Sequence, residues 1–63
     1  MKYKYRFEIF IENFDEEFET IDIVDTLEEA RFIAYQIPVE RYKSIMIHKL
    51  DENGRFIEEY DID

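Results

Sequence analysis

Hydrophobic and polar residues alternate along the first part of the chain. From Tyr3 to Ile11 the odd-numbered positions are aromatic or β-branched, and the even-numbered positions are polar except for Phe10. A period of two is typical of a β-strand that buries one face. Phe18–Val24 is rich in β-branched residues and contains neither glycine nor proline, so it is predicted to be the second strand. The two strands are expected to form an antiparallel hairpin across the polar connection Glu12–Glu17.

A helix is predicted after this hairpin, and both of its ends carry signals. Thr26 and Glu29 have the spacing of a capping box, in which the threonine hydroxyl accepts a hydrogen bond from the glutamate N–H group. Asp25 with Glu28 is an alternative that moves the start by one residue. Pro38 ends the helix, because the residue before a proline is forced out of helical angles.

The predicted helix, Leu27–Ile37, has one apolar face with two small residues that allow close packing on a sheet. Phe32 lies about 160° from the centre of this face, beside Tyr35. Both rings are therefore expected to point into solvent or toward another molecule. The apolar face itself comprises Leu27, Ala30, Ile33, Ala34 and Ile37.

Two more strands, Tyr42–Leu50 and Arg55–Ile62, complete the predicted fold. Between them, Asn53 and Gly54 tolerate the positive φ angles of a tight hairpin turn. The element order is thus ββαββ, and a helix with one apolar face covers one face of a sheet. The sequence predicts a single α+β domain over residues 1–63, in which a four-stranded antiparallel sheet carries one helix on one face.

The register of the second hairpin has two solutions. A two-residue loop aligns Lys49 with Glu58, whereas a three-residue loop slips the pairing by one and aligns Leu50 with Phe56. The first is preferred because it pairs opposite charges. In either register both faces of the hairpin carry apolar side chains.

The charge and the composition narrow the functional classes. The chain has 17 acidic and 8 basic residues, and its net charge of −9 disfavours non-specific contact with nucleic acid or anionic membranes. No apolar run approaches the ~20 residues that cross a bilayer. We expect a cytoplasmic protein that binds neither a membrane nor nucleic acid directly. Without cysteine there are no disulfides or thiolate zinc sites, and small domains then gain stability by self-association, which predicts a homo-oligomer.

Few side chains could support catalysis or hold a metal. His48 is the only imidazole, and Ser44 lies on the same strand face about 13 Å away, too far for a nucleophile–base pair. The residues around Asp51 lack the ligand spacing of a calcium loop. A single glycine makes no phosphate-binding loop. We expect a non-enzymatic protein with no cofactor and no metal.

The segment from Glu12 to Glu29 contains nine acidic residues and no basic one. Carboxylates on one face of a strand lie about 6.7 Å apart, and such a row can imitate a nucleic-acid backbone. The first functional hypothesis is therefore an acidic protein-interaction module, in its sharpest form a phage-type inhibitor that mimics nucleic acid and binds a basic nucleic-acid-handling protein. An ordinary solvated acidic surface is the alternative. The candidate carboxylates are Glu16, Glu17, Glu19, Asp22 and Glu28.

The second hypothesis rests on surplus apolar surface. Phe10 is expected on the outer face of the first strand, and Phe32 and Tyr35 on the outer face of the helix. Clustered exposed aromatics mark contact sites. The alternative function is a small structural or accessory homodimer that associates through its apolar sheet face or helix face. Phe14, in the first turn, is expected either at the surface or packed against Phe18.

Overall fold

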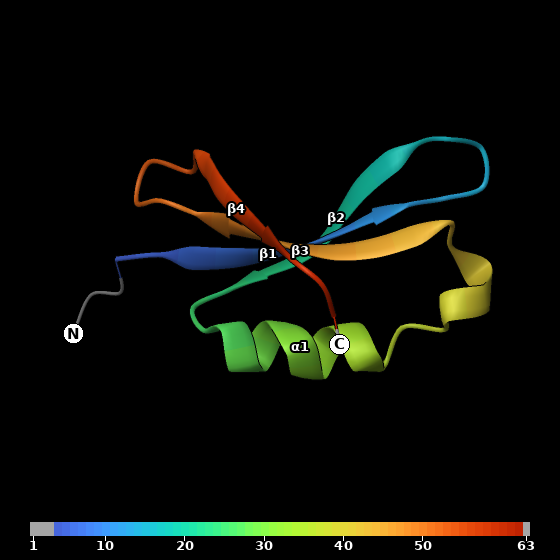
Figure 1. Ribbon diagram of the computed structural model, residues 1–63, viewed down its shortest axis with the longest axis horizontal. Helices are drawn as coiled ribbons and strands as arrows, with labels where there is room; N and C mark the ends of the chain where they lie inside the picture. Colours follow the sequence, from blue (N-terminus) through green and yellow to red (C-terminus); the bar gives the residue numbers. More distant parts are fainter. Residues whose placement is uncertain (1–3, 63) are drawn as a thin grey trace.

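Four antiparallel strands form one sheet, and a single helix packs on one of its faces, as the sequence predicts (Figure 1). The sheet order is β2-β1-β3-β4, so the two hairpins meet through their first strands and β2 and β4 are the edges. The computed structural model describes residues 4–62. In chain order its elements are β1 (Arg6–Glu12), β2 (Phe18–Val24), the helix α1 (Leu27–Tyr35), a short 3-10 helix η1 (Val39–Arg41), β3 (Ser44–Leu50) and β4 (Phe56–Tyr60).

The strand boundaries agree best with the prediction in β2, which has both of its predicted ends. β1 begins at Arg6, and the predicted start at Tyr3 lies outside the described residues. β3 begins at Ser44 instead of Tyr42, because η1, which the sequence analysis did not predict, occupies the connection. β4 is the shortest strand, with five residues.

The helix begins where the capping box predicts and ends two residues early. Thr26 is the N-cap, and its hydroxyl accepts from the N–H group of Glu29 at 3.1 Å. The hydroxyl also lies 3.3 Å from Oε1 of Glu29, to which it donates. At the other end the N–H groups of Gln36 and Ile37 donate to carbonyls three residues back, both at 3.1 Å, so the α-helix stops at Tyr35 before Pro38 is reached.

The core lies between α1 and the face of the sheet beneath it. Side chains from β1, β3 and α1 are at most 1% exposed there, and the margin is filled by Leu27, Ile33 and Ile37, so the predicted apolar helix face is confirmed. The small helix residues let the helix approach the sheet closely. The fully buried residues are Ile9, Ile11, Ala30, Ala34 and Ile47.

The loop of the first hairpin is a three-residue turn built on Asn13. The Asn13 N–H group donates to the Glu17 carbonyl at 2.9 Å, and Asn13 Oδ1 accepts from the N–H groups of Asp15 and Glu17 at 2.9 and 3.0 Å. Glu16 has a φ of 63°, in the left-handed region. A side-chain acceptor therefore defines this turn, although no glycine marks it.

The second hairpin uses both of the alternatives that the sequence left open. Its loop has three residues, and Leu50 pairs with Phe56, as in the second alternative. A β-bulge then restores the preferred register, so Lys49 faces Glu58. The bulge inserts Ile57 into β4, and a similar bulge inserts Ile21 into β2. Both edge strands are thus irregular.

Candidate functional site

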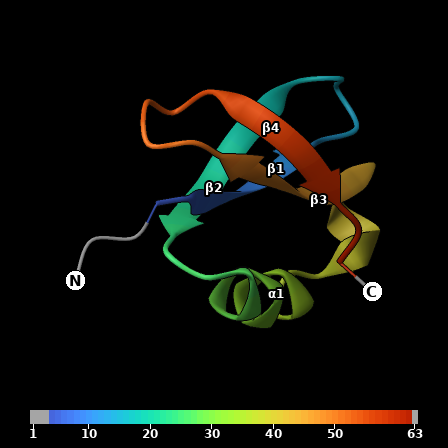
Figure 2. The same ribbon diagram turned by 60° about the vertical axis from the view of Figure 1, so that its left-hand side comes forward.

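The face of the sheet opposite α1 is open: within residues 4–62 no helix or strand covers it (Figure 2). Phe10 lies on this face, as expected from its place between the inward-facing Ile9 and Ile11. Its cross-strand neighbours are Met46 on β3 and Thr20 on β2. The strands thus present a second, solvent-facing set of side chains in addition to the core.

Four rings cross this open face in a line, one from each strand. Phe18 stacks on Phe10 with ring centroids 5.5 Å apart and planes at 12°. The imidazole of His48 follows at 4.9 Å from Phe10, and Phe56 meets His48 edge-on at 5.0 Å. The two end rings are 58% and 59% exposed. We call this row the aromatic ladder: Phe18, Phe10, His48 and Phe56.

His48 occupies the centre of the ladder and lies between two carboxylates. Its Nδ1 is 3.5 Å from Glu8 Oε1, and its Nε2 is 3.5 Å from Glu59 Oε1. Glu8 in turn accepts a hydrogen bond from the Thr20 hydroxyl at 2.6 Å. These contacts match the cross-strand pairing of His48 with both glutamates.

A second surface runs along the β2 edge of the sheet, on the helix side. Glu19 pairs with the buried Ile11, and Asp22 pairs with the buried Ile9. Residues three apart on a regular strand lie on opposite faces. The bulge at Ile21 removes this alternation, and both carboxylates therefore point to the same side as α1.

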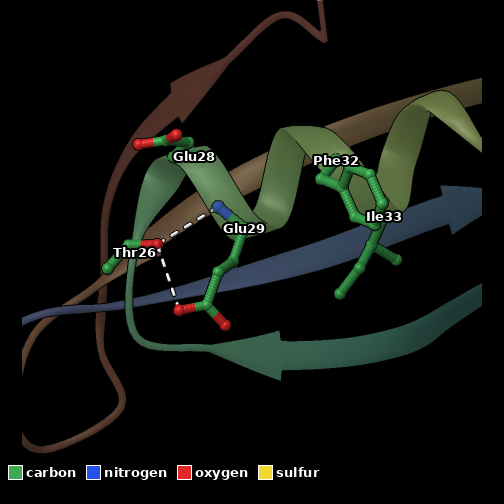
Figure 3. Close-up of a pocket in the computed structure, with 5 residues that line it drawn as sticks. All are labelled: Thr26, Glu28, Glu29, Phe32 and Ile33. Carbon is green, nitrogen blue, oxygen red and sulfur yellow. Dashed lines mark hydrogen bonds between the residues drawn. The ribbon is translucent and has the colours of Figure 1, made fainter.

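The first turns of α1 continue this surface and form a hollow of about 450 Å³ (Figure 3). Glu29, fixed by Thr26, extends toward β2, which passes alongside the helix in this view. Phe32 is 68% exposed and stands at the same hollow. We call this surface the acidic edge: Glu19, Asp22, Glu28, Glu29 and Phe32.

The remaining predicted partner-binding residues are dispersed. Tyr35 is exposed on the outer face of α1, where the helical phase predicts it. Glu16 lies in the first loop, 3.6 Å from Lys43 Nζ, and Glu17 accepts from the Asn13 amide at 3.4 Å. Phe14 is 65% exposed at the loop tip, and Phe18 packs on the ladder instead of on Phe14.

The side chains considered for catalysis have other partners. The Ser44 hydroxyl donates to Glu12 at 3.5 Å, and both His48 nitrogens face carboxylates. The Asp51 carboxylate accepts from the N–H groups of Asn53 and Arg55 at 2.8 and 2.9 Å. The Arg55 N–H bond is the main reason that the pKa of Asp51 lies below its usual 3.8. Asp51 therefore serves the turn.

Sequence reasoning missed three of the four ladder residues. Phe18 and Phe56 begin the edge strands, and their faces depend on the lengths of the hairpin loops, which the sequence did not determine. His48, the only imidazole of the chain, stands out in the sequence as a catalytic candidate, and its place in the ladder depends on rings from other strands. A signal existed, since each hairpin loop is followed at once by a phenylalanine.

Comparison with known proteins identifies no relative: no family model, curated protein or solved structure matches the chain. In the described part of the chain, no helix has the length and apolar character needed to cross a membrane.

Proposed function

We propose that this protein is a non-enzymatic interaction module that binds a basic protein through the acidic edge. The main support is the hollow at the start of α1, where the exposed ring of Phe32 stands beside Glu28 and Glu29. The net charge of −9 adds a long-range attraction toward positively charged surfaces.

The composition of the hollow suits lysine and arginine side chains. These residues pack an apolar stem against hydrophobic surface and keep the charged head in a polar environment. The stem would lie on Phe32 and the head near Glu28. A guanidinium group over an aromatic ring gains a further ~0.5–1 kcal/mol at an exposed site.

The row of carboxylates favours one class of partner. Glu19 and Asp22 on β2 continue the charge of the helix start, so the negative surface is extended instead of confined to one point. Proteins that handle nucleic acid carry extended positive grooves that bind phosphates. The proposed partner is a basic nucleic-acid-handling protein of the cytoplasm, and the module occupies its groove in place of nucleic acid.

Capture from host lysate on the immobilised protein tests the proposal. We expect a basic protein to bind at about 0.05 M salt and to elute by about 0.5 M, because screening weakens contacts between exposed charges. The double variant Glu19→Lys with Asp22→Lys and the single variant Phe32→Ser should each fail to bind this basic protein. Excess duplex DNA or RNA should displace it.

A matched control separates the acidic edge from the overall charge. Glu40→Lys with Glu52→Lys changes the net charge by the same amount at exposed positions elsewhere. This control should retain the partner. If both double variants lost binding equally, the overall charge of the protein would explain the binding, and this would contradict the proposed binding surface.

A further inference from the structure

We propose that the open face of the sheet is the interface of a homodimer, in which two copies pack sheet against sheet through the aromatic ladder. This face lies on the opposite side of the sheet from α1, so the proposal concerns a different surface from the acidic edge and goes beyond the function proposed above.

The open face leaves large apolar side chains exposed to solvent. Within residues 4–62 no aromatic side chain is fully buried, and the two end rings of the ladder are more than half exposed. The strand register adds Ile23, Met46 and Leu50 to the same face. Burying one aromatic ring removes about 150–250 Å² from water. Because a domain of this size buries little surface, burying these rings would add to its stability.

The charged groups of the open face already have partners inside the same chain. On β1, Arg6 lies 3.8 Å from Asp25, and Glu12 lies 3.7 Å from Lys43. Glu8 is held by Thr20 and His48, as described above. A basic partner therefore gains little charge complementarity here, because these groups already have ion-pair or hydrogen-bond partners in the same chain.

The ladder is close to symmetric about the line between β1 and β3. Two rings lie on each side of that line, and the end rings Phe18 and Phe56 are equally exposed. A two-fold axis parallel to the strands places Phe18 of one copy over Phe56 of the other and Phe10 over His48. Such an isologous contact uses one surface twice and closes after two copies.

The area of the open face and the bulges in the two edge strands also favour this arrangement. Four strands about 4.8 Å apart and about 23 Å long cover roughly 450 Å² in projection, and two such faces with their side chains bury on the order of 1,000 Å². Specific interfaces begin at about this size. The bulges at Ile21 and Ile57 disfavour the competing mode, strand addition at the edges.

The molecular mass in solution, measured by sedimentation at several concentrations, tests the interface. The unmodified protein should have twice the mass of the 7.9 kDa chain. Phe18→Lys and Phe56→Lys should each raise the dissociation constant at least tenfold while circular dichroism stays unchanged. Phe32→Lys, at a ring on the helix that is also more than half exposed, is the matched control and should remain dimeric.

Mixing variants tests the two-fold arrangement. Phe18→Lys and Phe56→Glu should each be monomeric alone, and their mixture should form a heterodimer, because one lysine then meets one glutamate and the other ring pair is intact. Failure of two folded variants to associate would overturn this arrangement. If the variants do not fold, an NMR dilution series on the unmodified protein tests the interface. On dilution, the methyl signal of Met46 should shift and that of Val39 should not.

Salt distinguishes the dimer from the binding proposed for the acidic edge. Raising the salt concentration screens the repulsion between two chains of charge −9 and should strengthen the dimer, whereas it should release a basic partner. A protein that stays monomeric at about 1 mM and high salt, or a dimer that only Phe32→Lys disrupts, would overturn the proposed interface.

Discussion

The loops of the two hairpins have the same hydrogen bonds but different residues at the positions that define them. In each, the first residue donates its N–H group to the carbonyl of the fifth at 2.9 Å and accepts with its side-chain oxygen from the N–H groups of the third and fifth. The acceptor is Asn13 in one loop and Asp51 in the other. The fourth residue has a positive φ in both: it is Glu16 in the first loop and Gly54 in the second.

This comparison separates two features of the turn: the side-chain acceptor at the first position and the glycine that usually occupies the fourth. Glycine adopts positive φ at little cost, whereas other L-residues lose roughly 1–2 kcal/mol there. The first loop forms with Glu16 at that position, so the side-chain acceptor at the first position is sufficient to define the turn. Glycine makes the same turn more stable.

The largest expected effect comes from removing the acceptor. Asn13→Ala leaves two backbone N–H groups without their side-chain partner, so we expect a loss of about 1–2 kcal/mol in the free energy of unfolding. Asp51→Ala removes the corresponding acceptor of the second loop and should also lower the free energy of unfolding. The two losses should be similar at pH 7, because each acceptor bonds the N–H groups of the third and fifth residues of its loop. Urea denaturation measures both. Glu52→Ala, in the same loop, is the control and should change stability by less than ~0.5 kcal/mol.

Exchanging the residue types at the fourth position should give effects of opposite sign. Gly54→Ala should lose about 1 kcal/mol of stability, and because nothing lies within 4 Å of the added Cβ, the loss comes from the backbone alone. Glu16→Gly should gain roughly 0.5–1 kcal/mol by relieving the same strain. Thermal or urea unfolding measures both.

A further variant isolates the backbone effect at Glu16. This residue is 3.6 Å from Lys43, and Glu16→Ala removes that ion pair while it keeps a side chain at positive φ. The difference between the glycine and alanine variants therefore reports the strain. Equal stability of the two variants would mean that positive φ carries no measurable cost in this loop.

The sequence predicted those parts of the fold that local patterns determine. β2, the N-cap Thr26 and the outward position of Phe32 follow from β-propensity, capping and helical phase, each of which acts within a few residues. The ββαββ order then leaves one reasonable architecture, because a single apolar helix face needs a single sheet face.

The candidate surfaces were predicted less completely, because they depend on long-range register. The ladder aligns rings from four strands, and the hairpin loops place Phe18 and Phe56 in it, because both rings precede the bulge in their edge strand. The bulge at Ile21 places Glu19 and Asp22 on one side, which strict alternation does not allow. The composition indicated that acidic and aromatic residues lie on the surface. Pairing between distant strands determines where on the surface the acidic residues and the aromatic residues cluster.

The smallest effect at neutral pH is expected from exchanging the two acceptors. Asp51→Asn reproduces the geometry that Asn13 already provides, so the free energy of unfolding at pH 7 should stay close to that of the unmodified protein. The stabilities of Asp51→Asn and the unmodified protein should differ at acidic pH. The pKa of Asp51 is lower in the folded protein than its usual 3.8, chiefly because of the Arg55 N–H hydrogen bond, so the stabilisation is present above pH 3.8 and is lost as the pH falls through the folded pKa.

Urea denaturation between about pH 2 and pH 7 measures this dependence. The variant should lose less stability than the unmodified protein on acidification below pH 3.8, and the two curves should agree above about pH 5. Parallel curves for Asp51→Asn and the unmodified protein would show that the carboxylate and the amide hold their loops equally at every pH, so the charge of Asp51 would add nothing to the turn.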